Sequence, residues 1–193
     1  MLKNLKDKEI ILASQSPRRQ ELLKGLGIDF KIVVKKDIDE NFDPEMPFEE
    51  VAEFLAKKKA NNYSDIINNG TVLITADTIV CTAEAILNKP TDKKEAEEML
   101  FSLSGEKHKV ITGVCIKSVA KQISFSSESV VYFADLTQEE IDYYIENYKP
   151  YDKAGAYGIQ EWIGYVGITR LEGSYFNVMG LPIQQVYSKL KTF

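Results

Sequence analysis

The sequence predicts an α/β protein with a mixed, twisted β-sheet flanked by helices. Apolar, β-branched runs alternate along the chain with amphipathic patterns of helical period, an order typical of a sheet covered by helices. The 193 residues are 44% hydrophobic and 27% charged, which is enough for a sizeable core. Because no internal repeat, low-complexity segment or linker interrupts them, we expect a single domain over residues 1–193.

The first half of the chain opens with a strand that runs into a helix. Ser16 is a suitable N-cap for this helix and Pro17 a suitable first helical residue. The alternating segment 29–35 predicts a second strand, and an acidic loop, 36–47, ends at Pro47, where a helix over about 48–62 begins. Residues 71–90 predict a buried strand followed by a hairpin-like return.

The second half continues the alternation of helices and strands. Residues 91–105 predict a helix, and 107–119 and 122–134 predict two long strands. Thr137 and Glu140 form a capping box for a helix over 137–148. The glycine-rich stretch 151–168 has little regular pattern before a strand near 164–171, and 181–190 predict the closing helix.

Composition and charge narrow the class of ligand. The formal net charge of -5 at pH 7 argues against a general partner such as nucleic acid or a membrane surface, so an anion site must be a local concentration of positive charge for a small ligand. Cys81 and Cys115 lie in apolar strand patterns and indicate buried thiols in a reducing cytoplasm. We expect neither a signal peptide nor a membrane span.

The start of the first helix carries an unusual concentration of positive charge. Arg18 and Arg19 fall in its first turn, where the helix dipole is already positive and each exposed cation costs roughly 0.3–1 kcal/mol. Together with the hydroxyls of Ser14 and Ser16 and the free backbone N–H groups, they indicate a phosphate site. The alternative is that Ser16 is only a cap and the arginines point to solvent. The glycine-rich loops that hold nucleotides in other proteins are absent from the sequence.

Asp77 is the one acidic residue in the segment LITADTIV, residues 73–80, at the end of a very apolar predicted strand. An unpaired charge buried there would cost several kcal/mol, so it needs a cation, a metal or a hydrogen-bond network, and this favours a functional role. The alternative is an aspartate that caps a tight turn at the strand end.

Lysines and further acids complete the candidate site. Lys89 lies before a proline and Lys153 in a Gly/Ala loop, both typical places for side chains at a cleft, whereas Lys59 by itself suits a solvated helix face. Asp39 and Glu40 could help bind a divalent metal, with a solvated acidic loop as the alternative. His108 is the only histidine, so it cannot build a zinc site, and we expect a structural role for it at a strand start.

Six segments together resemble the Maf (septum formation inhibitor) family of nucleoside triphosphate pyrophosphatases, over about residues 10 to 188: LASQSPRR, ADTIV, NKP, LSGEKHKVITGV, DKAGAYGIQ and EGSYFNVMGLP. The resemblance implies two lobes around a nucleotide cleft, as in the inosine triphosphate pyrophosphatase fold. It also implies hydrolysis of a nucleotide to its monophosphate and pyrophosphate, dependence on Mg²⁺ or Mn²⁺, a cytoplasmic location and a homodimer.

The resemblance also assigns roles to single residues. Asp77 matches the family's proposed general base, and Asp77 with Glu40 would hold the metal. The polar cleft positions are matched by Ser14, Arg19, Glu40, Lys59, Lys89 and Lys153. The positions tied to base specificity are matched by Arg18, Thr78 and Gln160. The segment KAGAYGIQ looks like that of the branch acting on dTTP and UTP, and the Gln160 amide suits the imide edge of uracil or thymine.

Two departures from the family pattern stand out. Tyr148, Lys149 and Pro150 replace the usual Gly-Glu-Pro, so a base replaces an acid, and Glu161 stands where a glycine usually follows the glutamine. The main functional alternative is a nucleotide-binding regulator of cell division with little turnover. Such a protein would keep the phosphate-holding arginines and lose the acid, so the presence of Asp77 favours the enzyme.

Overall fold

The computed structural model describes residues 2–36 and 38–193, and they fold as two compact units. The first unit comprises Met1–Asp77, Thr112–Ser127 and Gly180–Phe193, and the second comprises Thr78–Ile111 and Glu128–Met179. A single domain over residues 1–193 therefore stays a prediction. Asp37, within the predicted acidic loop, lies outside the described residues.

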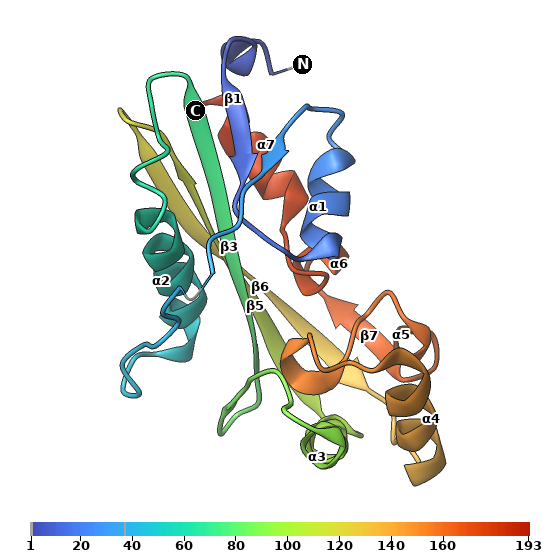
Figure 1. Cartoon of the computed structure of the whole chain (residues 1–193). Coiled ribbons are helices and arrows are strands. Elements are labelled where there is room, and N and C mark those ends of the chain that lie inside the picture. The colour runs from blue at the N-terminus through green and yellow to red at the C-terminus, as the bar shows by residue number, and fades with distance from the viewer. Residues whose placement is uncertain (1, 37) are drawn as a thin grey trace. The chain divides into compact units, whose positions relative to one another are not determined.

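The strands form one mixed sheet in the order β2–β1–β3–β5–β6–β7, with β4 paired to β3 (Figure 1). β1 is parallel to β2 and β3, whereas β4 is antiparallel to β3 and β7 is antiparallel to β6. The strands are β1 Glu9–Leu12, β2 Lys31–Ile32, β3 Thr71–Cys81, β4 Ile86–Leu87, β5 Lys107–Lys117, β6 Gln122–Phe133 and β7 Ile168–Glu172. The helices are η1 Lys3–Leu5, α1 Pro17–Lys24, α2 Phe48–Asn61, α3 Lys93–Leu103, α4 Gln138–Tyr148, η2 Ala154–Ala156, α5 Trp162–Val166, α6 Tyr175–Val178 and α7 Ile183–Lys191.

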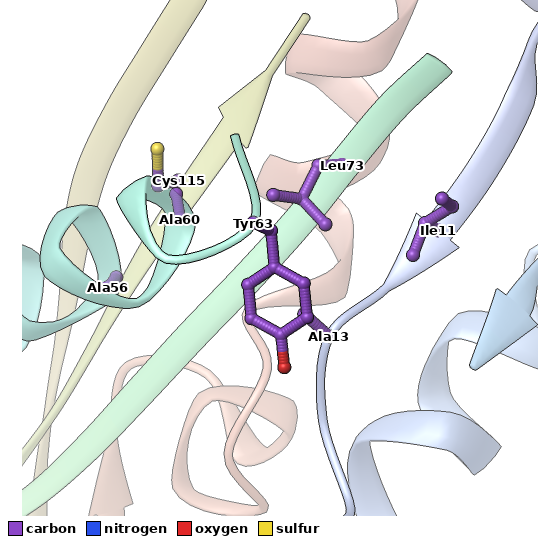
Figure 2. Close-up of a cluster of buried hydrophobic side chains, with 7 residues drawn as sticks. All are labelled: Ile11, Ala13, Ala56, Ala60, Tyr63, Leu73 and Cys115. Carbon is purple, nitrogen blue, oxygen red and sulfur yellow. The ribbon is translucent and has the colours of Figure 1, made fainter. Parts of the chain in front are cut away.

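In the first unit, helices cover both faces of the strands. α2 lies on one side of β1 and β3, and α1 and α7 lie on the other (Figure 1). The side that faces α2 has a core cluster of residues that lie in β1, β3, β5 and α2 or directly after them. Its members are Ile11, Ala13, Ala56, Ala60, Tyr63, Leu73 and Cys115 (Figure 2). The predicted sheet flanked by helices is thereby confirmed.

α2 approaches β5 closely because Gly113 has no side chain. A Cβ atom at this position would overlap the backbone of Ala52 and Glu53 in α2. Ser124 of β6 donates a hydrogen bond to Glu53 Oε1 at 2.7 Å, which holds the same helix over the neighbouring strand. The spacing between α2 and the sheet is thus set by one glycine.

In the second unit, α3 and α4 pack against each other, and Nζ of Lys93 in α3 lies 3.3 Å from Oε1 of Glu146 in α4.

His108 is 2% exposed, and its Nε2 lies 2.7 Å from the hydroxyl of Tyr157. The rings of His108, Phe133 and Tyr157 pack with centroids 5.2 to 5.4 Å apart. Burial lowers the pKa of His108 from 6.5 to about 4. The prediction of a structural histidine at a strand start is confirmed.

Most predicted elements agree with the observed ones. Ser16 caps α1 with Pro17 at the helix start, and Thr137 and Glu140 form the capping box of α4. The predicted strand 29–35 is much shorter, since only Lys31–Ile32 pair. The predicted strand near 164–171 is wrong at its start, where Trp162–Val166 form α5, and the strand β7 covers Ile168–Glu172. The short helix α6 was not predicted either. Cys81 and Cys115 are buried free thiols, as expected. Among the described residues, the helices are all too short or too polar to cross a membrane.

Gly113→Ala should lower the free energy of unfolding by about 2 kcal/mol or more, since the added methyl group must push α2 away from β5. Chemical denaturation of the variant measures the change. Gly70→Ala is the control, because its Cβ would approach only the Asn68 side chain, at 3.3 Å. Equal stability of the two variants would contradict the close approach of α2.

Stability should fall as the pH is lowered from 7.5 to 5. The unfolded chain binds a proton at His108 below about pH 6.5, whereas the folded chain does so only near pH 4, so protonation favours unfolding in this window. The expected loss at pH 5 is about 2 kcal/mol. Denaturation curves at both pH values measure it. His108→Gln, which does not titrate and can still pair with Tyr157, should remove most of this difference.

Candidate active site

Asp77 lies on the side of β3 that faces α2. Alternate residues of a strand share a face, and three of them here meet α2 in succession. Leu73 belongs to the apolar cluster, the Thr75 hydroxyl donates to the carbonyl of Ala56 at 2.7 Å, and Asp77 binds Lys59. The strand therefore changes from apolar to polar to charged contacts along one helix.

Lys59 connects two carboxylates. Its ammonium group forms an ion pair with Asp77 and a second one with Glu40, at 3.0 Å from Oε1. The side chains of Lys59 and Asp77 are each only 13% exposed, whereas that of Glu40 is 54% exposed. The buried carboxylate of Asp77 therefore has the cation that the sequence analysis requires for it, supplied by Lys59 on the adjacent helix.

The turn before α1 is ordered by its own serines. Ser14 is buried, and its hydroxyl accepts a hydrogen bond from the backbone N–H of Ser16 at 3.2 Å. Its carbonyl accepts a further bond from the Gln20 amide at 3.1 Å. The Ser16 hydroxyl in turn accepts from the N–H of Arg19. In the described structure, both hydroxyls stabilise the turn that presents the two arginines.

Arg19 bridges three segments of the first unit. Its Nε donates to the carbonyl of Gly180 at 2.7 Å and its Nη1 to the carbonyl of Ala76 at 2.9 Å. Burial lowers the pKa of Arg19, and the negative charges of Asp77 and Glu40 oppose this shift. Arg19 therefore does not point freely to solvent, and it fixes the backbone directly before Asp77.

In the second unit, the loop that contains Lys153 is hydrogen-bonded to the segment that follows β4. The N–H of Gly155 donates to the carbonyl of Asn88 at 3.1 Å, which places this loop beside the residue before Lys89. Gly155 has a φ of 68°, and a Cβ there would lie 2.9 Å from Val80. Only glycine suits both constraints. Lys89 itself is exposed.

Lys153 is buried and paired with acids. Its ammonium group lies 2.8 Å from Asp152 and 3.1 Å from Oε1 of Glu161. Oε2 of Glu161 accepts a hydrogen bond from the hydroxyl of Tyr144, which itself accepts one from the N–H of Gly158 at 3.0 Å. Glu161, which departs from the family pattern, is thus part of a connected hydrogen-bond and ion-pair network within this unit.

Gln160 lies within this network as part of a turn. The N–H of Glu161 donates to the carbonyl of Gly158 at 3.0 Å, so Gln160 is the third residue of a four-residue turn. Its side-chain Oε1 is buried and has no hydrogen-bond partner among the described residues. A buried acceptor without a donor is costly, which marks a position where a ligand N–H would be favourable.

Residues 2–36 and 38–193 contain no cluster of three His, Cys, Asp or Glu side chains placed to hold a metal ion. They do contain two carboxylates, those of Asp77 and Glu40, that both form ion pairs with the ammonium group of Lys59. Mg²⁺ is commonly held by one or two protein carboxylates with phosphate oxygens and water. This donor set therefore fits an ion that binds together with a phosphate ligand.

The predicted residues fall into two groups. The structure brings Arg19, Glu40, Lys59 and Asp77 together in the first unit, where Arg18 is partly exposed in the first turn of α1. Lys89, Lys153, Gln160 and the half-buried Thr78 belong to the second unit. Lys149, the other departure, is the exposed C-cap of α4 with a φ of 45°.

Sequence reasoning missed Tyr144, because a tyrosine on an amphipathic helix gives no sign of what its hydroxyl will bind. It also missed the carbonyl partners of Arg19, because backbone acceptors carry no residue-specific signal. The partner of Asp77 on α2, Lys59, lies in a lysine cluster that by composition suits a solvated helix face, so the ion pair could not be read from the residues alone.

Comparison with solved structures finds a HAM1 protein from Coxiella burnetii, with a TM-score of 0.49 and 15% identity, over 96% of this chain and 100% of that one. Sequence comparison finds higher similarity. A dTTP/UTP pyrophosphatase of Parabacteroides distasonis is 52% identical over 193 residues, which cover 100% of both chains. One from Porphyromonas gingivalis is 53% identical, over 100% of this chain and 98% of the relative. The model of the family described as Maf-like protein matches residues 9–193, and the chain therefore belongs to the Maf family.

Proposed function

We propose that this chain is a nucleoside triphosphate pyrophosphatase that hydrolyses dTTP and UTP to the monophosphate and pyrophosphate. The names of relatives about half identical over the whole chain support this activity. The observation that carries it is the ion-paired Asp77 within the apolar strand β3, with Lys59 and Glu40 beside it. A protein that only senses a nucleotide has no use for this buried acid.

Asp77 acts as the general base in this proposal. It orients and deprotonates a water molecule that attacks the α-phosphorus, and pyrophosphate leaves. Lys59 keeps the buried carboxylate neutralised before substrate binds, and Arg19 fixes the adjacent backbone through Ala76. Glu40 and Asp77 would hold Mg²⁺ or Mn²⁺, which supplies positive charge against the phosphates when bound.

The remaining polar residues bind the two ends of the substrate. Lys89 and Lys153 stabilise charge on the phosphates, and Ser14 belongs to a helix start that is suited to anions. Arg18, Thr78 and Gln160 contribute to base recognition. The buried Gln160 Oε1 suits the single imide N–H of uracil or thymine, and its amide group can donate to the neighbouring carbonyl.

The same proposal assigns a location and an assembly. The two buried free thiols, Cys81 and Cys115, suit the reducing cytoplasm, where nucleoside triphosphates are made and used. Burial raises the pKa of Cys115 to about 11, which keeps this thiol protonated and inert. A homodimer follows only from the family resemblance and stays a prediction.

Asp77→Asn should slow turnover of dTTP by at least ~100-fold while nucleotide still binds, since the general base is lost and the phosphate contacts remain. Separate assays for pyrophosphate and orthophosphate measure rate and product, and pyrophosphate is the expected product of the wild type. Asp65→Asn is the matched control, because Asp65 is also paired with a lysine, Lys35, but at the surface. Wild-type turnover in Asp77→Asn would favour the regulator instead, and orthophosphate as the sole primary product would exclude cleavage between the α and β phosphates.

Gln160→Ala should reduce base selectivity without abolishing catalysis. The wild type is expected to prefer dTTP and UTP over ATP and GTP in kcat/KM by about ten-fold or more, which corresponds to about 1.4 kcal/mol. Loss of the amide should reduce this ratio, because the phosphates are bound elsewhere. Kinetics with the four nucleotides provide the measurement. Gln184→Ala, on the exposed side of α7, is the control and should keep the ratio. An unchanged ratio in Gln160→Ala would remove Gln160 from base recognition.

A further inference from the structure

The turn that carries Gln160 is held at both ends by one phenol oxygen. The Tyr144 hydroxyl accepts from the N–H of Gly158, the first residue of the turn, and donates to the carboxylate of Glu161, the last. Tyr144 is fully buried on α4, and its ring stacks on that of Tyr148 at 5.1 Å. Since the ring is fixed, its oxygen is a rigid anchor for the turn.

Glu161 is fixed from the other side as well. Its second carboxylate oxygen lies 3.1 Å from the ammonium group of Lys153. The side chains of Lys153 and Glu161 are 8% and 19% exposed, so solvent screens this ion pair little. Burial and the hydrogen bond to Glu161 raise the pKa of Tyr144, so the phenol stays protonated and donates throughout the neutral range.

The Gln160 amide and the Glu161 carboxylate both lie close to Gly158, the residue whose N–H binds Tyr144. A Cβ at Gly158 would lie 2.9 Å from the Gln160 Nε2 and 3.0 Å from the Glu161 Oε2. The amide and the carboxylate therefore fold back over the same glycine, side by side. The position of the Glu161 carboxylate therefore limits the space that is open to the Gln160 amide beside this glycine.

We propose that Glu161 and Tyr144 are positioning residues for base recognition, which orient the Gln160 amide by clamping the turn Gly158–Glu161. This inference rests on the proposed function and adds residues that do not themselves touch the nucleotide. Base selectivity then depends on the hydrogen bond from Tyr144 to Glu161, the residue next to Gln160, whose amide binds the base.

Three variants separate the parts of the network. Tyr144→Phe removes the hydroxyl and keeps the ring, and Glu161→Ala removes the carboxylate. Glu161→Gln keeps an acceptor for Tyr144 and loses the charge facing Lys153. Tyr143→Phe is the matched control, since it makes the same chemical change at the neighbouring, 47% exposed tyrosine.

The readout is the ratio of kcat/KM for dTTP to that for GTP, with pyrophosphate as the measured product. The ratio should fall about ten-fold in Tyr144→Phe and Glu161→Ala, because the misplaced amide no longer matches the imide edge. Glu161→Gln should keep the ratio within about two-fold, because Tyr144 still binds the side chain. The control should match the wild type. Thermal melting verifies that each variant is folded.

Trp162 provides a second readout that does not require turnover. It is the only tryptophan of the chain and directly follows Glu161. Its fluorescence, titrated with α,β-imido-dUTP and Mg²⁺, should report a Kd about ten-fold weaker in Tyr144→Phe, whereas the Kd of the α,β-methylene analogue of ATP should change little.

The outcomes are distinct. A uniform loss of activity toward all nucleotides in Tyr144→Phe and Glu161→Ala, with the wild-type ratio kept, would show a general structural role and overturn the inference. Equal loss of selectivity in Glu161→Gln and Glu161→Ala would assign the effect to the Lys153 ion pair instead of the Tyr144 hydrogen bond, and would overturn it too. A wild-type protein that releases no pyrophosphate from any nucleotide would refute the proposed function itself.

Discussion

The need to neutralise a buried carboxylate organises the first unit. Asp77 lies among apolar residues within β3, and its charge can remain there only with a cation in contact. Lys59 supplies the cation from α2, which requires that helix to lie close along β3 and β5. Gly113 makes the approach possible, and the apolar cluster around Leu73 stabilises it. The packing of the core and the ionisation of the candidate base are thus consequences of the same helix position.

The arginines at the start of α1 show how an unfavourable charge can be compensated within the fold. The sequence indicates that something negative must offset two cations at a helix N-terminus. In the structure, Arg19 donates to the carbonyls of Ala76 and Gly180 and lies in the field of Asp77 and Glu40. Much of the compensation is therefore internal. Under the proposed function, a phosphate would meet an arginine that is already oriented, which would reduce the ordering cost of binding.

The regular elements were predictable because their signals are local. A continuous apolar run defines β3, strand patterns define β5 and β6, and the caps at Ser16 and Thr137 mark where α1 and α4 begin. Asp77 could be singled out as a candidate because a charge in an apolar run must be explained. The role of Glu161 was not, since its partners, Tyr144 and Lys153, are 17 and 8 residues away in sequence and meet only in the folded loop. Side-chain networks of this kind depend on tertiary contacts that no local pattern encodes.

The charge balance around the two central lysines explains why the proposed reaction includes a divalent ion. Lys59 faces Asp77 and Glu40, and Lys153 faces Asp152 and Glu161, so each cluster of one cation and two anions has a net charge of -1. Lysines that are already paired offer little uncompensated positive charge to a triphosphate. A ligand of that charge would be repelled by the carboxylates unless further cations accompany it. In the proposed reaction, Asp77 and Glu40 would hold such an ion, which would supply the positive charge that offsets this repulsion.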